Sequence, residues 1–150
     1  MDLRISDKCY LSRELCRYRV LDPYDQECIN DAFEFFKLPI TLPPQRQILL
    51  STVEVISVPP NKVGFIGLRS TWARLGLICP QTVADPGFEG TLTFEVFNTS
   101  VNRIQLSPGD VVFHIFYVPV EESVEIYTGR YQHQIGVTLP KSLKIPQQQV

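Results

Sequence analysis

The chain has 150 residues, of which 44% are hydrophobic and 20% are charged, and its formal net charge is −2. This length fits one domain that buries roughly two thirds of its unfolded surface, and the interspersed charges exclude the broad basic surface that long nucleic acid requires. Because no apolar run reaches the roughly 18 residues of a membrane-spanning helix, and no apolar signal region follows the first residues, we expect a soluble, cytoplasmic protein that does not contact a membrane.

An amphipathic helix over residues 6–18 is the first predicted element, because Ser6 or Asp7 can cap it and Leu11 and Leu15 lie one turn apart. Further along the chain the pattern becomes strand-like and is punctuated by prolines. Short β-rich runs, separated by Pro-Pro, Pro-Gly or Glu-Glu turns, cover residues 48–56, 63–66, 91–98, 111–118 and 124–127.

Several short strands at this spacing are typical of a β-sandwich or jelly roll, so the predicted fold class is all-β with a short N-terminal helix. No internal repeat divides the chain, and we expect a single domain over residues 1–140. Residues 141–150 contain three consecutive glutamines near the end and are expected to form a mobile tail.

The first candidate binding segment begins at Arg69. Arg69 and Arg74 flank a stretch that Ser70 could cap and Gly76 could end, which predicts a single helical turn. Its free N–H groups and two guanidinium groups would then point the same way and suit a phosphate. Taken alone, Ser70 could be only a helix cap, and the chain has neither a P-loop nor a Gly-x-Ser-x-Gly turn that would make it a nucleophile.

The strand at 91–98 holds the second candidate, the carboxylate of Glu95. Three apolar residues alternate on one face of this strand: Leu92, Phe94 and Val96. Glu95 therefore lies on the opposite face with Thr93 and Phe97, where it needs either solvent or a partner. We expect Arg74 to be that partner, because a nearby cation favours the ionised form that a general base requires.

Five motifs follow one another along the chain: Arg-Ser-x-x-x-Arg-Leu-Gly-Leu at 69–77, Asp-Pro-Gly-Phe-x-Gly at 85–90, Phe-Glu-Val-Phe-Asn at 94–98, Leu-Ser-Pro-Gly-Asp at 106–110 and Arg-Tyr-Gln-His-Gln-Ile-Gly at 130–136. In this order they resemble those of the family of dCTP deaminases and dUTPases. The resemblance also reaches back to 20–25 and 42–44, so it covers nearly the whole chain. Several motifs in order are far more specific than one alone.

The resemblance implies a dUTPase-like distorted jelly roll that assembles as a homotrimer, because the family builds each site at a subunit boundary. Deaminases of the family, including bifunctional ones that go on to hydrolyse dUTP, carry a glutamate at the position of Glu95, and ordinary dUTPases do not. The leading expectation is therefore hydrolytic deamination of dCTP to dUTP and ammonia, with Glu95 as general base and with Ser70 and Arg74 positioning water and stabilising charge.

The substrate-binding residues also follow from the resemblance. The segment 69–74 would hold the triphosphate through Arg69, Ser70, Thr71, Trp72, Ala73 and Arg74. Asp85, which without this context would be an ordinary turn residue, would contact the deoxyribose 3′-hydroxyl, and Phe88 would pack on the sugar where a 2′-hydroxyl would clash. Thr93 and Phe94 would offer backbone groups to the edge of the base.

The same resemblance assigns a closing segment near the end of the chain. Tyr127 and Arg130 would lie near the phosphates and Gln134 near the base, although lysine is common at the position of Arg130. Mg²⁺ would bind the triphosphate oxygens rather than a protein cage. The four cysteines form no Cys-x-x-Cys pair, and the His-x-Glu and Pro-Cys-x-x-Cys elements of zinc-dependent deaminases are missing, so we expect no protein-bound zinc.

Two departures from the family pattern leave alternatives open. The link over 77–85 is about two residues shorter than in comparable deaminases, with Pro80 and Gln81 in place of a small polar pair. The segment 32–36 also departs from the usual Ala-Ser-Tyr-Asp-Leu. One alternative is a dUTP diphosphatase, alone or bifunctional, in which Asp85 helps to orient water toward the α-phosphate. The other is a trimeric nucleotide-binding or regulatory protein without turnover.

Overall fold

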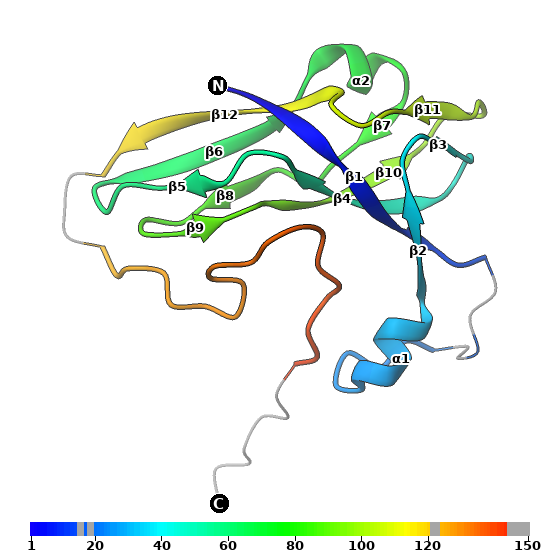
Figure 1. The fold of residues 1–150 in the computed structure, drawn as a ribbon, viewed down its shortest axis with the longest axis horizontal. Helices are drawn as coiled ribbons and strands as arrows, with labels where there is room; N and C mark the ends of the chain where they lie inside the picture. The colour runs from blue at the N-terminus through cyan, green and yellow to red at the C-terminus, as the bar shows by residue number, and fades with distance from the viewer. Residues whose placement is uncertain (15–16, 18–19, 121–123, 144–150) are drawn as a thin grey trace, which may run out of the picture.

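The computed structural model describes residues 1–14, 17, 20–120 and 124–143. These residues form a mostly β structure with two short helices, α1 (Gln26–Asp31) and α2 (Ser70–Arg74), which confirms the predicted class (Figure 1). The strands are β1 (Asp2–Ser12), β2 (Phe33–Lys37), β3 (Ile40–Leu42), β4 (Gln47–Thr52), β5 (Ile56–Ser57), β6 (Lys62–Leu68), β7 (Leu77–Ile78), β8 (Thr82–Ala84), β9 (Glu89–Gly90), β10 (Thr93–Asn98), β11 (Ile104–Leu106) and β12 (Val111–Pro119).

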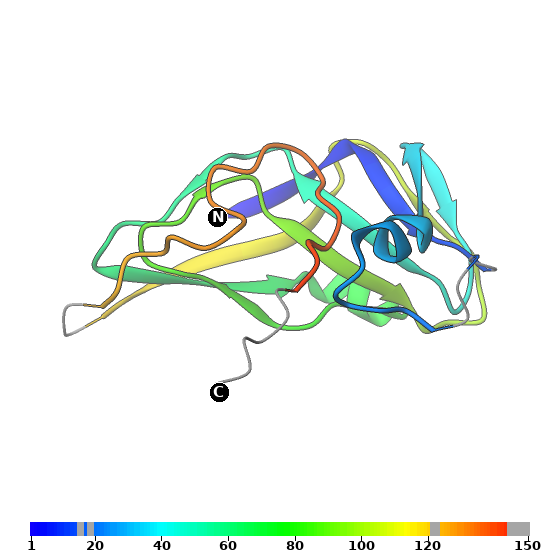
Figure 2. The same cartoon turned by 90° about the horizontal axis from the view of Figure 1, so that it is seen from below.

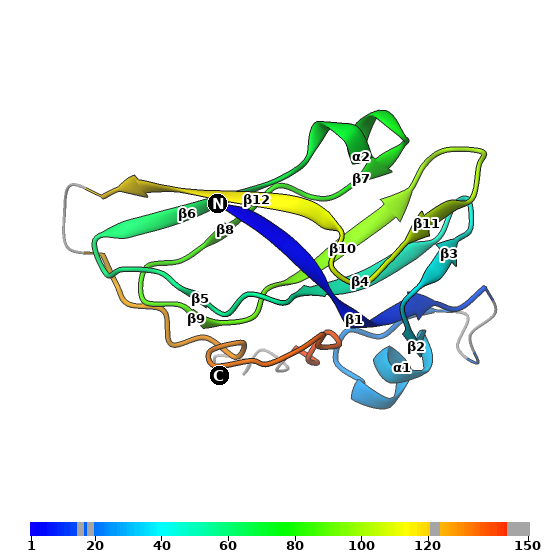
Figure 3. The same cartoon turned by 45° about the horizontal axis from the view of Figure 1, so that its top comes forward.

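One large sheet carries the fold, in the order β7-β10-β4-β1-β12-β6-β8, and β2 also pairs with β1. The smaller pairs β11-β3 and β5-β9 stand apart from it. Strand β1 pairs with β12 near its start and with β4 over most of its length, and register shifts after Leu3 and after Ile5 allow it to bend between the two. Figure 3 shows β1 crossing obliquely between β12 and β4.

The sheet curls until its two halves face each other. Phe94 of β10 and Phe113 of β12 are separated by β4 and β1 in the sheet, yet their rings stack with centroids 3.8 Å apart. Both rings are buried, together with alternate residues of the neighbouring strands. This curled sheet encloses an apolar core, and burying that surface is the main source of stability.

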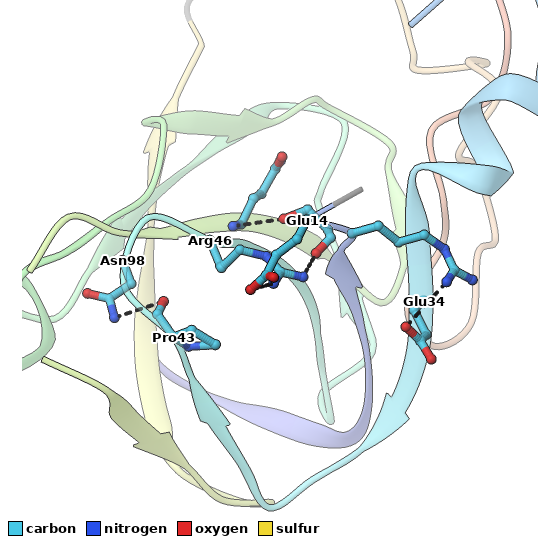
Figure 4. A network of polar contacts seen from close by, with 8 residues as sticks. Glu14, Glu34, Pro43, Arg46 and Asn98 are labelled. Atoms are coloured by element: carbon cyan, nitrogen blue, oxygen red, sulfur yellow. Dashed lines mark hydrogen bonds and ion pairs between the residues drawn. The ribbon is translucent and has the colours of Figure 1, made fainter. Parts of the chain in front are cut away.

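Polar contacts fix the end of the sheet near β10. Arg46 pairs with Glu14 at 2.9 Å and also donates to the Ser12 carbonyl, which ties the turn before β4 to the end of β1. The Asn98 amide donates to the Pro43 carbonyl at 3.1 Å (Figure 4). These contacts fix the end of β10, the strand that carries Glu95.

The predicted helix over 6–18 is wrong for residues 6–12, which belong to β1. Leu3 and Ile5 face the core on one side of a bend, and Cys9 and Leu11 face it on the other, so the apolar residues follow the period of a strand. Residues 13, 14 and 17 are not helical either, and residues 15, 16 and 18 of the predicted helix lie outside the described residues.

The short helix instead starts after Asp25, whose carboxylate accepts hydrogen bonds from the N–H groups of Glu27 at 2.9 Å and Cys28 at 3.3 Å. This is α1.

Four of the five predicted β-rich runs do contain strands, and the run at 48–56 divides into β4 and β5.

The predicted strand over 124–127 is also wrong. Residues 124–143 form an irregular segment, called the strap below, that runs over β9 and β10 (Figure 2). The Tyr127 N–H donates to the Pro86 carbonyl at 2.9 Å, which is a turn rather than a strand edge, so no ladder can form there. Residues 144–150 of the expected tail lie outside the described residues. Within the described part of the chain, no helix has the length and apolar character to span a membrane.

Candidate active site

A cavity of about 220 Å³ lies between the sheet and the strap. The sheet side contributes five residues that the sequence predicted as binding or catalytic: Asp85, Phe88, Thr93, Phe94 and Glu95. The strap contributes two more, Tyr127 and Gln134. Segments that are up to about fifty positions apart in the sequence therefore meet around one hollow, which is the form expected of a small-molecule site.

Glu95 stands on the cavity wall as the alternation of β10 predicts. Phe94 and Val96 are buried while Glu95 is exposed. Two effects raise the pKa of the Cys79 thiol to about 12: first its burial, and second the negative charge of the nearby Glu95 carboxylate. Cys79 is therefore a neutral thiol beside the carboxylate and not a nucleophile.

The turn between β8 and β9 positions Asp85 and Phe88. The Phe88 N–H donates to the Asp85 carbonyl at 3.0 Å, and Gly87 between them has φ +80°, which favours glycine. A Cβ added at Gly87 would come within 2.4 Å of the Ile126 side chain, so the strap packs directly on this turn. Phe88 is buried and meets the Tyr127 ring edge-on at 5.7 Å, which leaves the exposed Asp85 carboxylate as the polar group of the turn.

The predicted phosphate segment folds as a helical turn, α2, but its details differ from the prediction. Arg69 rather than Ser70 occupies the cap position, and no side chain caps the helix. Gly76 ends the turn with φ +100°, as predicted. The Trp72 indole donates to the Val111 carbonyl at 2.8 Å and packs against the core, so in this chain it anchors α2 to β12.

Residues 69–74 do not line the cavity of their own chain. Arg69 pairs with Asp2, and the expected ion pair between Glu95 and Arg74 does not form within the described residues. The structure thus brings together the predicted base and sugar residues and leaves the predicted phosphate residues elsewhere.

Arg130 also points away from the cavity in this chain. Its guanidinium donates to the carbonyls of Lys141 at 3.2 Å and Ser142 at 2.5 Å, so it holds the end of the strap together. Tyr127 accepts a hydrogen bond from the Tyr131 N–H at 3.3 Å. Tyr127 therefore lines the cavity and Arg130 does not, although the resemblance placed both residues near the phosphates.

Sequence reasoning missed part of the strap that lines the cavity, namely Tyr131, Thr138, Leu139 and Pro140. These residues stand in an irregular segment, where no periodic pattern marks an inward face. A second cavity of about 200 Å³ adjoins the first, shares Thr82 and Phe94 with it, and holds Pro80 and Gln81 of the shortened link. Gln81 therefore borders the neighbouring cavity.

The match to a protein family identifies the family of this chain. Residues 1–120 match the family described as dCTP deaminase-like. The chain belongs to the dCTP deaminase-like family. Membership makes it a nucleotide-modifying enzyme, and it confirms the resemblance drawn from the sequence motifs.

Relatives within the dCTP deaminase-like family are similar in sequence to most of this chain. The dCTP deaminase of Pyrobaculum arsenaticum is 43% identical over 126 residues, which are 83% of this chain and 71% of the relative. That of Aeropyrum pernix is 41% identical over 140 residues, which are 87% of this chain and 76% of the relative.

Solved structures show the same fold. The 2′-deoxycytidine 5′-triphosphate deaminase of Agrobacterium tumefaciens superposes with a TM-score of 0.70 at 18% identity, over 83% of this chain and 43% of that one. This chain thus spans less than half the length of that structure. The dUTPase from phage phi11 of S. aureus gives a TM-score of 0.50 at 18% identity, over 62% of this chain and 77% of that one. Both confirm the dUTPase-like fold that the motifs implied.

The described residues contain no group of three or more His, Cys, Asp or Glu side chains that could hold a metal ion. Cys9, Cys28 and Cys79 are free thiols, and the fourth cysteine lies outside the described residues. The expected absence of zinc from this dCTP deaminase-like chain stays a prediction.

Proposed function

We propose that this protein hydrolytically deaminates dCTP to dUTP and ammonia, with Glu95 as the general base. The observation that carries the proposal is the position of Glu95, an exposed carboxylate on the wall of the cavity between β10 and the strap. Relatives that are 40–43% identical to this chain are dCTP deaminases, which supports the same substrate.

The chemistry needs a group that both accepts and returns protons at one place. Glu95 takes a proton from water, and the resulting hydroxide attacks C4 of the cytosine. The carboxylate passes this proton to N3. It then takes the remaining proton from the new C4 hydroxyl as the C4=O bond forms and passes it to the leaving amine, so one residue serves both halves of the reaction. The electron pair of the breaking C4–N bond leaves with the amine as ammonia.

The cavity suits the nucleoside part of the substrate. Its volume of about 220 Å³ lies below the roughly 300–1,000 Å³ of most ligand pockets, so a triphosphate must extend beyond it. Asp85 stands on the wall as an acceptor for a sugar hydroxyl, and Phe88 lines the same wall with its ring against that of Tyr127. Thr93 and Phe94 contribute backbone groups of β10 to the base.

A second copy of the chain must supply the phosphate site. In the described chain the charged residues on the cavity wall are the carboxylates Asp85 and Glu95, and a triphosphate needs cations instead. We propose a homotrimer in which the segment 69–74 of one copy, with Arg69, Ser70 and Arg74, completes the cavity of the next.

An exposed apolar ladder fits such an assembly. Val83 on the cavity rim is 45% exposed and pairs in register with Phe65, which pairs with Phe116, itself 52% exposed. The rings of Phe65 and Phe116 stack with centroids 5.6 Å apart. A neighbouring copy that covers this ladder would lie next to the cavity.

Mg²⁺ is proposed to bind through the triphosphate rather than through protein ligands. It keeps most of its water and usually takes one or two carboxylates together with substrate phosphates. The metal would neutralise phosphate charge. The cytoplasmic location of the protein, which is a separate point, stays a prediction.

A second candidate function is hydrolysis of dUTP to dUMP and diphosphate, alone or after deamination. It is favoured by Asp85, which shares the cavity with Glu95 and would orient water toward the α-phosphate. The non-catalytic alternative has less support, because the departing segment 32–36 lies almost entirely in β2, which pairs with β1 and contributes no residue to the cavity wall.

Separate incubation with dCTP and with dUTP tests the proposal. We expect dCTP to give dUTP and ammonia, resolved by chromatography and an ammonia assay. Release of dUMP from dCTP would indicate the bifunctional form, and release of dUMP from dUTP alone would favour the diphosphatase. If neither nucleotide is changed while both bind, the proposed catalysis is wrong.

A further inference from the structure

Thr138 of the strap sits where the strap crosses β10, on the wall of the cavity. Its hydroxyl lies 2.8 Å from the Gln134 Oε1 and 3.3 Å from the Thr93 hydroxyl. Its backbone N–H donates to the same Thr93 hydroxyl at 3.2 Å. Thr138 is therefore the link between two residues proposed to contact the base.

The direction of each hydrogen bond follows from what each atom can do. Gln134 Nε2 donates to the Thr91 carbonyl at 2.7 Å, and a carbonyl can only accept, so the amide nitrogen must face Thr91. The Oε1 of Gln134 then faces Thr138 and can only accept, so the Thr138 hydroxyl donates to it. Since that hydroxyl has one proton, it must accept from Thr93.

This network holds the Gln134 carboxamide at both ends. A half-turn of the amide would place its oxygen against the Thr91 carbonyl and its nitrogen against the Thr138 hydroxyl, which would break one bond and reverse the other. One N–H and one lone pair of the carboxamide remain for the cavity, in a fixed order. A fixed order matters for recognition, because cytosine offers an acceptor at N3 and a donor at N4, whereas uracil offers the reverse at N3 and O4.

We propose that Thr138 is a specificity-determining positioning residue. Its hydroxyl fixes the orientation of the Gln134 carboxamide, so that the cavity distinguishes an amino-pyrimidine nucleotide from an oxo-pyrimidine nucleotide. Thr138 acts through Gln134 and Thr93 and takes no part in bond making. The inference rests on the proposed function of the cavity, and it adds a residue that the sequence motifs did not single out.

The test compares Thr138→Val, which keeps the shape and loses the hydroxyl, with Thr138→Ser, which keeps the hydroxyl. Thr41→Val on the exposed face of β3 is the matched control. For Thr138→Val we expect the ratio of dCTP to dUTP affinity to fall by about fivefold, the effect of one hydrogen bond. Thr138→Ser should stay within about twofold of the wild type, and Thr41→Val should not change the ratio.

A measurement without nucleotide separates this inference from the proposed function. In the wild type, the Gln134 side-chain amide proton that is bonded to the Thr91 carbonyl should exchange slowly with water when followed by NMR, and in Thr138→Val it should exchange faster. Equal exchange in both proteins would overturn the inference, as would an equal loss of affinity for both nucleotides. If the wild type converts neither nucleotide but the amide is protected as expected, the proposed function fails while the positioning of Gln134 stands. Thr138→Ala serves as a second hydroxyl-free variant if the valine protein does not fold.

Discussion

Glu95 has buried neighbours on both sides along β10, and its own side chain is exposed in the cavity. The alternation of the strand therefore turns this carboxylate away from the buried face of β10. The nearest titrating neighbour with a shifted pKa is Cys79, whose thiol stays protonated partly because of the Glu95 charge. Cys79 therefore does not compete with Glu95 for the proposed role of general base.

Replacement of Glu95 by glutamine keeps the shape of the side chain and removes its capacity to accept a proton. We expect the rate of dCTP deamination to fall by about 10²-fold or more, while dCTP still binds. Stability should change by less than about 0.5 kcal/mol, because the side chain is exposed. Steady-state kinetics and thermal melts measure both, and near-normal turnover in the folded variant would show that another group is the base.

The orientation of Glu95 could be predicted from the sequence, because every second residue of a strand shares a face. Its surroundings could not. Cys79 reaches it through the packing of β7 against β10, and Thr138 comes from an irregular strap. Arg74, which the sequence placed beside Glu95, lies on a helix that does not line the cavity in this chain, because local spacing carries no information on which chain completes a site.

Cys9 in the core predicts a loss of stability at high pH. Burial raises the pKa of its thiol from 9.0 to about 11. Because the folded-state pKa is raised, this stabilising contribution is complete below pH 9 and is lost as pH rises toward 11. The loss amounts to roughly 2 kcal/mol at pH 11. Urea unfolding of the wild type and of Cys9→Ala should show a steeper fall between pH 9 and pH 11 in the wild type, and parallel curves would contradict the shift.

The strap is held at its far end by α1. The Gln26 amide donates to the Pro140 carbonyl at 3.0 Å and accepts from the Ser142 N–H at 2.8 Å, as a neighbouring strand would. The Leu143 N–H also donates to the Pro23 carbonyl at 2.7 Å. A helix near the start of the chain therefore holds the segment that covers the cavity.

Gln26→Ala removes both side-chain bonds and should loosen the strap. We expect faster hydrogen exchange over residues 138–143 and a KM for dCTP raised by about threefold to tenfold, with little change in kcat, because two hydrogen bonds are lost far from the reacting atoms. Gln105→Ala on the exposed face of β11 is the control. An unchanged exchange rate would show that α1 does not hold the strap.

Strands and helices could be predicted from the sequence where the apolar residues kept one spacing along the whole element. Strands β6, β10 and β12 satisfy this condition, and all three were predicted. In β1 the bend after Ile5 interrupts the alternation, so the residues beyond it satisfied a helical spacing as well as a strand spacing. The signal for α1 was present in Asp25 as a cap, but a helix of six residues offers too short a pattern for its period to stand out.

Across the whole molecule, the cavity and the segment 69–74 lie apart in one chain, which predicts an obligate assembly. Light scattering at micromolar concentration should give about three times the 17.1 kDa chain mass, as expected for closed cyclic symmetry. Phe116→Lys places a charge in the exposed apolar ladder and should shift the mass toward that of the monomer, with loss of deamination. A fully active monomer would contradict the shared site.

Subunit mixing tests whether two copies of the chain build one active site together. Glu95→Gln and Arg74→Ala should each be nearly inactive toward dCTP as pure proteins, since one lacks the base and the other the cation. When the two variants are unfolded together, refolded as hybrid trimers and assayed for ammonia release, about one quarter of the sites should combine an intact Glu95 from one copy with an intact Arg74 from the next. Activity near that fraction of the wild type is the predicted result. No activity above that of the separate variants would show that one chain supplies both groups, or that these residues do not deaminate dCTP.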